Sequence, residues 1–382
     1  MIRKYTQGFA DYFKAQNAFA FWKGRVALYA ILKAMGVDAG DEIILPGYTC
    51  VMDVNPIKYL GAKPVYVDIE PDTFNINVKL MEEKITSSTK AIIAQHTYGY
   101  SCEMDTIMSI ADAKGIPVIE DCCLAFGSKF KGKMVGTFGK AAYFSFQWNK
   151  PYTTGIGGMA ITNDTELAEK IKLLCNKELC QPSKKEIMLL AAQLAVYRAF
   201  VYPRTTALAQ SLFRYLTKKG TVVGSSSTGE FKPVMAPDFF KGMSTIQARA
   251  GLRQLKKLHK NIEHRKEMAG LYDRLLAEKG WPARKYDSST MEPVMVRYPV
   301  RIAEKNEALE KAARAGIELG SWFECPLHPI ETPLEAYDYK PGMCPQAERA
   351  SREVVNLPLH PRTSEKTVKR TVEFITQFTK VQ

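Results

Sequence analysis

The fold of this chain is decided by residues 141–158, which read AAYFSFQWNKPYTTGIGG. The stretch begins as an apolar run of strand-forming residues and ends in small residues and glycines, and Lys150 stands between the two parts. Glycines let the backbone approach a bound group closely, because they have no Cβ. A lysine held among aromatic residues can lose charge through desolvation and become a nucleophile. A lone loop lysine is usually a surface residue, so its interpretation depends on the residues upstream.

The upstream residues 117–127, PVIEDCCLAFG, predict a short strand that ends in Asp121. Ligands of α/β sheets bind at the carboxyl ends of strands. Residues 132–139, GKMVGTFG, then lead directly into the strand before Lys150. An aspartate and a lysine at neighbouring strand ends are the two protein groups that pyridoxal phosphate requires, the lysine for a Schiff base and the aspartate for the protonated pyridine nitrogen. We therefore predict Lys150 and Asp121 as catalytic residues.

In order, spacing and residue type, these motifs resemble the sugar aminotransferases of the DegT/DnrJ/EryC1/StrS group, from about Trp22 to the C-terminal helix. The resemblance implies the fold-type I aminotransferase architecture, an α/β fold. Its large domain has a mostly parallel sheet with helices on both faces, and a smaller C-terminal α+β domain follows. We place the large domain at residues 1–260, with a helical insertion at about 177–240, and the small domain at residues 261–382. Alternating strand and helix patterns independently favour a parallel sheet.

The resemblance also implies where the cofactor phosphate binds. A turn at Gly24 and Arg25 opens a helix, and the free amides of a helix start form an anion site. The family usually has a hydroxyl residue where Arg25 stands; the arginine side chain could bind phosphate by a charge-assisted contact or point elsewhere. Ser145 precedes Lys150 by the spacing at which the family places a serine hydroxyl on the phosphate.

Three positions depart from the family pattern. Cys50 stands where an aromatic residue usually stacks on the pyridine ring, and Tyr48 either supplies that ring from a shifted position or fills core. Leu124 replaces a histidine or glutamine beside the cofactor. Phe239 and Phe240 occupy the stretch in which relatives carry an asparagine that reaches the neighbouring subunit's phosphate. The predicted cofactor-binding residues are Gly24, Arg25, Tyr48, Cys50, Asp121, Leu124, Ser145 and Lys150.

The histidines point to no metal site. Residues 91–99, AIIAQHTYG, predict a strand with His96 and Tyr98 at its end on the presumed cofactor side. We favour a packed, hydrogen-bonded His96 over a catalytic one. For His328 and His360 the sequence is equally compatible with structural and functional roles. The eight cysteines have no metal-ligand spacing and favour reduced thiols of the cytoplasm.

The composition narrows the class of protein further. The chain has 382 residues, and its 53 basic against 40 acidic residues give a net charge of +13, which favours anionic ligands or acidic surfaces. The basic residues are spread over the chain and form no recognisable nucleic-acid module, so we predict no nucleic-acid partner. The N-terminus lacks the apolar core of a signal peptide. No stretch has the roughly 18 uncharged apolar residues of a spanning helix. We therefore expect a cytoplasmic protein.

The insertion interrupts the resemblance. Its apolar stretches carry interleaved lysines and arginines between residues 184 and 219, a pattern typical of a membrane-surface element. The alternative is a helical hairpin that packs on the body or on a partner subunit. The expected location is accordingly the cytoplasm, with contact to a membrane surface as an added hypothesis.

These features predict a homodimeric, pyridoxal-phosphate-dependent aminotransferase. We expect it to move an amino group, from glutamate by family resemblance, to a keto-sugar that is free, nucleotide-linked or lipid-linked. Two alternatives remain at this stage. One is a sugar dehydratase on the same scaffold, although relatives with that activity replace the lysine with histidine. The other is a non-catalytic binding or regulatory protein, which the changes at Cys50, Leu124 and Phe240 keep open.

Overall fold

The computed structural model describes residues 1–197, 228–282 and 284–381. A seven-stranded sheet with the order β1-β10-β9-β6-β5-β2-β4 forms its centre. These strands are β1 (Asn17–Phe21), β10 (Gly158–Thr162), β9 (Ala141–Ser145), β6 (Val118–Asp121), β5 (Thr89–Gln95), β2 (Glu42–Pro46) and β4 (Lys63–Val67). Strand β10 runs antiparallel to both of its neighbours, whereas β9, β6, β5, β2 and β4 run parallel to one another. The predicted, mostly parallel sheet is confirmed.

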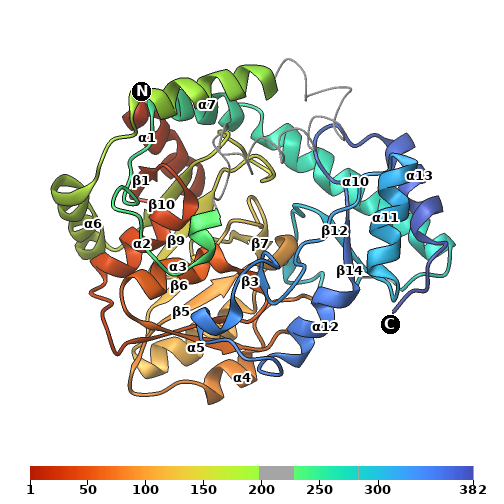
Figure 1. Cartoon of the computed structure of the whole chain (residues 1–382), viewed down its shortest axis with the longest axis horizontal. Coiled ribbons are helices and arrows are strands. Elements are labelled where there is room, and N and C mark those ends of the chain that lie inside the picture. The colour runs from red at the N-terminus through yellow and green to blue at the C-terminus, as the bar shows by residue number, and fades with distance from the viewer. Residues whose placement is uncertain (198–227, 283, 382) are drawn as a thin grey trace.

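Helices cover both faces of this sheet (Figure 1). One face packs against α2 (Gly24–Ala34), α3 (Val51–Tyr59) and α6 (Thr165–Glu178), and the other packs against α1 (Ile2–Phe13), α4 (Val78–Glu83), α5 (Met104–Lys114) and α9 (Thr245–Leu255). Successive strand residues point to opposite faces. In β9, Tyr143 therefore joins the α2 side of the core, whereas Phe144 packs among the aromatic residues of α1.

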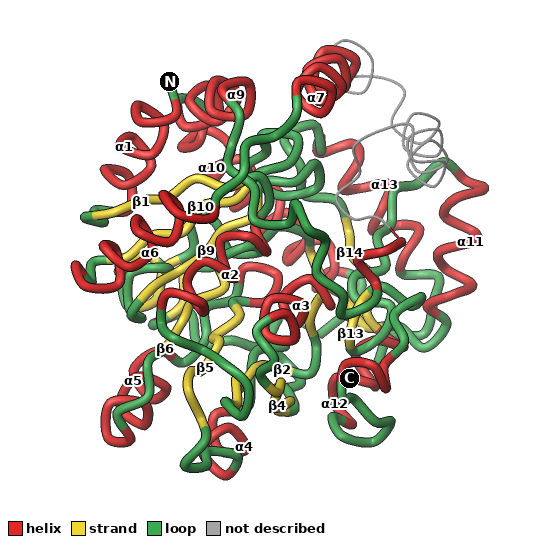
Figure 2. The backbone as a smooth tube through the Cα atoms, turned by 60° about the vertical axis from the view of Figure 1, so that its left-hand side comes forward, coloured by secondary structure: helices red, strands yellow, loops and turns green. Residues whose placement is uncertain are grey.

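The C-terminal part of the chain lies beside the sheet (Figures 1 and 2). It contains α10 (Leu258–Glu278), β12 (Tyr298–Arg301), α11 (Lys305–Ala315), α12 (Pro345–Glu353), β14 (Val354–Leu357) and α13 (Glu365–Ile375), and β12 pairs antiparallel with β14. Helix α10 runs without a break through residue 260, where we placed the domain boundary. The division into two domains stays a prediction.

Short strands connect the C-terminal part to the N-terminal part. Strand β11 (Met291–Glu292) pairs with β7 (Lys129–Phe130), which also pairs with β8 (Lys133–Met134). Strand β13 (Leu327–His328) pairs in parallel with β3 (Thr49–Cys50). The second pairing matters for function, because it brings residues near 328 to the end of the central sheet. Three short 3₁₀ helices, η1 (Thr97–Gly99), η3 (Thr228–Phe231) and η4 (Leu334–Tyr337), complete the described elements with α7.

Helix α7 (Lys184–Val196) is the main helix among the described residues of the predicted insertion. Its start is fixed by a capping box between Ser183 and Glu186. Its inner side packs through Leu190 and Leu194 against Trp22 and Ile156. Its outer side is open: Met188 is 71% exposed. Residues 198–219 of the predicted membrane-surface element lie outside the described residues. Among the described residues, no helix combines the length and apolar character needed to cross a bilayer.

Candidate active site

The strand register brings three polar side chains into one row. Gln95 on β5 is paired with Asp121 on β6, and Asp121 is paired with Tyr143 on β9. Ser145 lies two residues beyond Tyr143 and so on the same face of β9. The chain then leaves the strand and reaches Lys150 in the following turn, where the Lys150 amide donates a hydrogen bond to the Gln147 carbonyl oxygen (3.0 Å). The strand period therefore places Gln95, Asp121, Tyr143 and Ser145 on the α2 side of the sheet, and the turn after β9 brings Lys150 to the same side.

A cavity of about 270 Å³ lies against this row. All the predicted site residues except Tyr48 line it, and so do residues from four other segments. The lining residues that we discuss are Lys23, Gly24, Arg25, Cys50, Asp53, Gln95, Asp121, Cys123, Leu124, Ser145, Lys150, Gly157, Phe231, Trp322, Phe323 and His328. The cavity thus joins the helix start at Gly24, the aspartate strand, the lysine turn and the segment that leads into β13.

Tyr48 does not reach the cavity. Its ring is fully buried in the core, and its hydroxyl group lies 2.8 Å from the Tyr98 hydroxyl and accepts a hydrogen bond from the Phe323 amide (3.1 Å). The hypothesis that Tyr48 stacks on the cofactor ring is therefore wrong for this structure, and the core alternative describes it. Cys50 and Leu124 do line the cavity. Burial raises the pKa of Cys50 to about 11, so this side chain is a neutral thiol.

Of the phenylalanines near residue 240, Phe240 is a core residue and Phe239 is partly buried against the core. Phe240 packs between Phe21 and Tyr29, with ring centroids 6.0 and 5.6 Å away, and Phe239 packs on Tyr29 and Tyr59. Both rings thus help to hold α2 and α3 in place. Neither phenylalanine lines the cavity.

Helix α2 begins directly against the end of the sheet, and glycines make this approach possible. A Cβ on Gly24 would lie only 2.8 Å from the Ser145 Cβ, and one on Gly158 would lie 2.6 Å from the Gly24 Cα. No side chain would fit at either position without moving the backbone. The close contact sets the positive end of the helix beside the Ser145 hydroxyl group, at the cavity wall. This arrangement fits a phosphate group.

The same end of the cavity carries two basic side chains. Glu230 holds both of them: its carboxylate lies 3.0 Å from Lys23 Nζ and 2.7 Å from Arg25 NH1. Burial lowers the pKa of Lys23 to about 8, with a further contribution from the positive charge of Arg25, and Glu230 opposes this shift. The Arg25 side chain is thus directed to the Glu230 carboxylate. The backbone amide of Arg25 lies at the start of α2. Lys23 and Glu230 were not predicted as site residues.

A second carboxylate accompanies Asp121. The Asp121 side chain is 2% exposed, and its Oδ1 accepts a hydrogen bond from the Cys123 amide (2.8 Å). A carboxylate has two acceptor oxygens, so its Oδ2 can accept a hydrogen bond from a ring nitrogen. Asp53, in the first turn of α3, lines the same cavity and accepts a hydrogen bond from the Tyr143 hydroxyl (2.9 Å). Sequence analysis missed Asp53, because an acidic residue in a first helical turn is an ordinary feature.

Aromatic residues close the cavity beside Lys150. The Lys150 Nζ lies 5.0 Å from the centre of the Trp322 ring, and the Arg297 guanidinium lies 4.6 Å from the same ring. Both distances fit cation–π contacts. His328 also lines this side; burial lowers its pKa to about 4, although Glu324 opposes the shift, so its imidazole is neutral near pH 7. Trp322 and Phe323 were missed by sequence analysis, since they lie far along the chain from the lysine motif.

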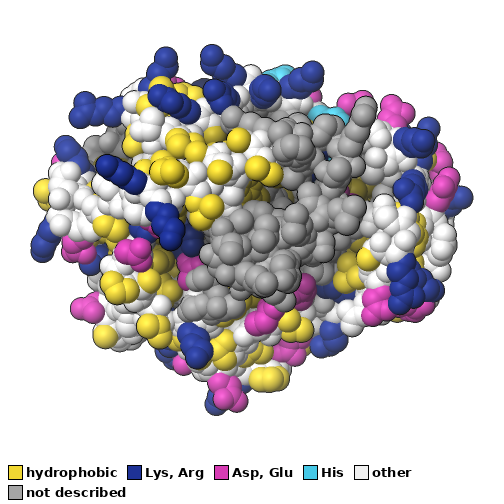
Figure 3. Space-filling model, turned by 45° about the horizontal axis from the view of Figure 1, so that its top comes forward, with side chains coloured by type: hydrophobic (Ala, Val, Ile, Leu, Met, Phe, Trp, Pro, Cys, Tyr) yellow, Lys and Arg dark blue, Asp and Glu magenta, His cyan; other side chains and the backbone are white. Residues whose placement is uncertain are grey.

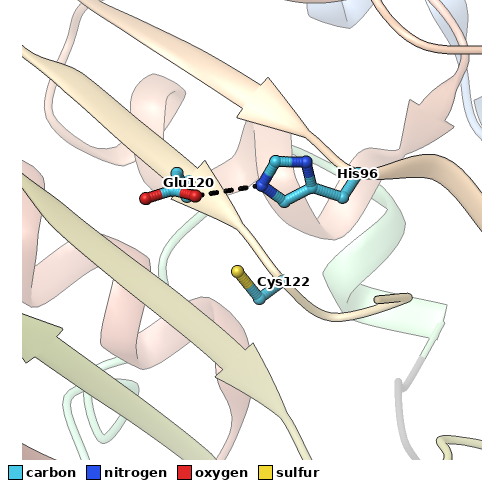
Figure 4. A group of neighbouring side chains, drawn as sticks. All are labelled: His96, Glu120 and Cys122. Carbon is cyan, nitrogen blue, oxygen red and sulfur yellow. Dashed lines mark hydrogen bonds and ion pairs between the residues drawn. The ribbon is translucent and has the colours of Figure 1, made fainter. Parts of the chain in front are cut away.

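His96 contacts Glu120 (Figure 4), whose side chain alternates with that of Asp121 on β6 and so lies on the other face of the sheet. Its Nδ1 accepts a hydrogen bond from the Cys102 amide (3.0 Å), so its Nε2 carries the proton and donates to Glu120 (3.2 Å). The expectation that His96 faces the cofactor side is wrong, because the neighbouring Gln95 takes that face. A packed, hydrogen-bonded His96 is what the structure contains.

Glu120, His96 and Cys122 bring their potential metal-ligand atoms within 4.8 Å of one another. The Glu120 carboxylate is already saturated by His96 and by the amides of Gly136, Phe138 and Gly139, at 2.6 to 2.8 Å for the amides. Burial raises the pKa of the Cys122 thiol, which disfavours the thiolate that a metal needs. The group instead anchors the loop before β9 and so supports the strand that leads to Lys150.

The sequence model of the DegT/DnrJ/EryC1/StrS aminotransferase family matches residues 1–191 and 205–376. GDP-perosamine synthase of Escherichia coli O157:H7 is 33% identical over 99% of this chain and 90% of its own length. An L-glutamine:2-deoxy-scyllo-inosose aminotransferase of Streptomyces paromomycinus is 29% identical over 87% of this chain and 70% of its own.

Solved structures agree on the fold. The aminotransferase of Psychrobacter cryohalolentis has a TM-score of 0.75 at 22% identity and covers 98% of this chain and 90% of its own. A sugar aminotransferase of Streptococcus pneumoniae in its pyridoxal-phosphate form has a TM-score of 0.76 at 23% identity, with coverage of 98% and 90%. The likeness confirms the fold-type I architecture. With the family match over nearly the whole chain, it follows that this protein belongs to the DegT/DnrJ/EryC1/StrS aminotransferase family and is a pyridoxal-phosphate-dependent sugar aminotransferase.

Proposed function

We propose that Lys150 and Asp121 are the catalytic residues of this aminotransferase and that the cavity between them holds pyridoxal phosphate. The observation that supports this most strongly is the row across the sheet: Asp121 and Ser145 share one face, and Lys150 follows Ser145 into the same cavity. When bound, pyridoxal phosphate supplies a carbonyl carbon for covalent attachment and a ring that withdraws electrons.

Each of these residues then has a defined task. Lys150 Nζ would hold the cofactor and would move a proton at the substrate carbon as general base and acid. The Asp121 carboxylate holds a proton on the ring nitrogen through a charge-assisted hydrogen bond. The amides of Gly24 and Arg25, with the Ser145 hydroxyl, bind the phosphate at the start of α2. Cys50 and Leu124 contribute apolar wall and no further charge.

The acceptor that we propose is a keto-sugar carried by a nucleotide, and the donor is glutamate. The name of the relative from Escherichia coli, GDP-perosamine synthase, refers to a sugar linked to a nucleoside diphosphate. The cavity carries Lys23 and Arg25 beside Glu230, and the chain as a whole has a net charge of +13, both of which favour an anionic substrate. A relative named for L-glutamine makes glutamine the alternative donor to test. A dehydratase is disfavoured, because Lys150 is present.

The test is a half-reaction. Protein loaded with pyridoxamine phosphate is mixed with matched pairs of keto-sugars, free and nucleotide-linked, and the return of the pyridoxal absorbance reports amino transfer. We expect return with nucleotide-linked keto-sugars, and glutamate should regenerate the aminated form faster than glutamine. Return with free sugars alone would contradict the nucleotide link. Sugar consumption without an aminated product would instead identify the dehydratase.

A second part of the proposal concerns assembly: the protein works as a homodimer, and the outer side of α7 is its candidate contact surface for a partner subunit or an anionic membrane. Figure 3 shows the face that carries α7, where hydrophobic side chains lie among lysines and arginines. Met188 and Val196 are exposed there, at 71% and 54%, and Lys184 and Lys185 precede them. Near anionic lipid each such lysine contributes about 1 kcal/mol.

Vesicle flotation combined with a mass measurement separates the two roles of this surface. Lipid contact predicts binding to anionic liposomes that weakens with salt and is lost in Met188→Asp, while the protein keeps its dimeric mass. A subunit contact predicts no flotation, and Met188→Asp converts the dimer to a monomer. The matched control is Leu173→Asp on α6, which places the same charge at another exposed apolar residue, 65% accessible. Equal effects of both variants would show that α7 has no special role.

A further inference from the structure

Asp53 is a titratable group in the cavity for which the mechanism above has no task. It stands in the first turn of α3, lines the cavity with Asp121 and Lys150, and is partly buried. Its Oδ1 accepts a hydrogen bond from the Tyr143 hydroxyl at 2.9 Å. Its Oδ2 lies 3.3 Å from the Thr49 hydroxyl oxygen. Two carboxyl groups therefore face one small cavity, and the protonation of the second one decides how much negative charge the cavity holds.

The hydrogen bonds around Thr49 indicate where the proton lies. Gln95 donates both N–H groups of its amide, to the Tyr48 carbonyl oxygen (2.9 Å) and to the Thr97 hydroxyl (3.0 Å), so its Oε1 faces Thr49 at 2.5 Å. An amide oxygen only accepts, so Thr49 donates its single hydroxyl proton to Gln95. A hydrogen bond between Thr49 and Asp53 then requires a proton on Asp53. This contact is longer than a typical O–H···O bond, so the charges around Asp53 matter as well.

Those charges also favour a neutral Asp53. Burial raises its pKa to about 7, and the nearby Asp121 carboxylate adds to the shift, whereas Lys150, the Tyr143 hydroxyl and Arg25 oppose it. The groups that face Asp53 thus come from every element around it: Thr49 and Cys50 on β3, Asp121 on β6, Tyr143 on β9, Lys150 in the turn after β9, and Arg25 on α2. Filling of the cavity by a bound molecule would remove water from Asp53 and strengthen the effect of burial.

We propose that Asp53 is a positioning residue that keeps its carboxyl group protonated on the acidic side of neutral pH, so that in this range Asp121 supplies negative charge to the cofactor cavity and Asp53 does not. The protonated group joins Tyr143 to Thr49 and Gln95 in one hydrogen-bonded chain beside the catalytic row. When Asp53 ionises at higher pH, a second negative charge appears at the cavity wall and increases the proton affinity of the Lys150 nitrogen. This inference rests on the proposed roles of Lys150 and Asp121.

The first test uses the protein without cofactor, so its outcome does not depend on the proposed function. A carboxyl group whose pKa is higher in the folded than in the unfolded chain, where it is about 3.9, binds a proton more tightly when folded. The contribution of Asp53 to folding stability is therefore highest at low pH, falls as the pH rises toward the folded value of about 7, and is constant above it. The difference between the melting temperature of the wild type and that of Asp53→Asn should decrease as the pH rises from about 4 to about 8. The control Asp112→Asn on α5 should give a flat difference.

A second variant covers the case in which Asp53→Asn does not fold. Tyr143→Phe removes the hydroxyl donor that favours ionised Asp53, and phenylalanine fills the same core position. The pH range over which stability falls should then move to higher pH. A pH-independent difference for Asp53→Asn would mean that Asp53 is ionised throughout. An unmoved range for Tyr143→Phe would mean that the fall in stability does not report Asp53, and either result would overturn the proposal.

The positioning role has its own readout in the holoenzyme. Removal of the Asp53 charge should lower the pH midpoint of the absorbance change that reports protonation at the Lys150-linked cofactor. The midpoint should stay unchanged in Asp112→Asn. If Asp53 titrates in the stability experiment but leaves this midpoint unchanged, its charge does not act on Lys150 and the positioning role is wrong. Failure of cofactor to attach at Lys150 at all would instead contradict the proposed function, and the two failures are thus distinguishable.

Discussion

Lys150→Ala is expected to lose covalent capture of pyridoxal phosphate completely. Wild-type protein should be yellow, and borohydride should fix the cofactor on Lys150, because this lysine lines the cavity beside Asp121. Turnover should fall at least about 10²- to 10⁴-fold, the range that one acid–base group contributes, and covalent attachment is lost in addition. Mass spectrometry of the reduced, digested protein measures the attachment site.

Two matched variants sharpen this experiment. Lys150→Arg keeps a cation near the Trp322 ring but supplies no nucleophilic amine, so it should fail to capture the cofactor as well. Lys172→Ala, at an exposed position of α6, should behave as wild type. The sharpest contradiction would be attachment at Lys23, the other lysine of the cavity that we discuss, whose pKa burial lowers to about 8.

Asp121→Asn should reduce turnover far more than it reduces cofactor content. A charge-assisted hydrogen bond contributes about 1.5–3 kcal/mol, which corresponds to roughly a ten- to hundredfold change in rate. Without the carboxylate, the ring nitrogen is less protonated and the ring withdraws electrons poorly. Cofactor retention depends instead on Lys150 and on the helix start at Gly24, which the substitution leaves in place. Steady-state kinetics and cofactor absorbance on the same samples provide the comparison.

The control for this variant is Asp112→Asn, the same chemical change on the exposed side of α5. It should alter neither rate nor cofactor content. Loss of cofactor in parallel with loss of rate would mean that Asp121 mainly holds the fold, through the hydrogen bond that its Oδ1 accepts from the Cys123 amide. Unchanged turnover would show that the ring nitrogen is bound elsewhere.

Local sequence was enough to locate the residues around which the candidate site is built. The spacing from Asp121 to Ser145 and Lys150 predicted three groups at neighbouring strand ends, and the parallel register of β6 and β9 brings them to one cavity. Gly24 was predicted as the start of a phosphate-binding helix, and a Cβ there would collide with Ser145. These features follow from sequence because strand periodicity and the absence of a side chain act over a few residues.

Other residues near strand ends, such as Tyr48 and His96, were harder to assign to a face of the sheet. Sequence alone left Tyr48 between stacking and core, and it set His96 on the wrong face of the sheet. Whether a residue just past a strand keeps the strand's alternation depends on how the chain turns there. With the turn that follows β5, the Gln95 side chain is directed toward the cavity, whereas His96 is buried against Glu120 on the opposite face. Tyr48 is held in the core by Tyr98 and Phe323, which are distant in sequence.

The sequence by itself thus determined the fold class and located the residues that we propose as the catalytic pair and the phosphate-binding turn. Only the tertiary structure brought Asp53 beside Asp121, closed the cavity with Trp322 and His328, and joined Arg25 to Glu230, 205 residues away. The physical reason is the distance along the chain over which each effect relates residues. Periodicity and turn chemistry relate residues that are neighbours in the chain, whereas the charge and shape of a cavity depend on segments that meet only when the C-terminal part packs on the sheet through β13 and β3.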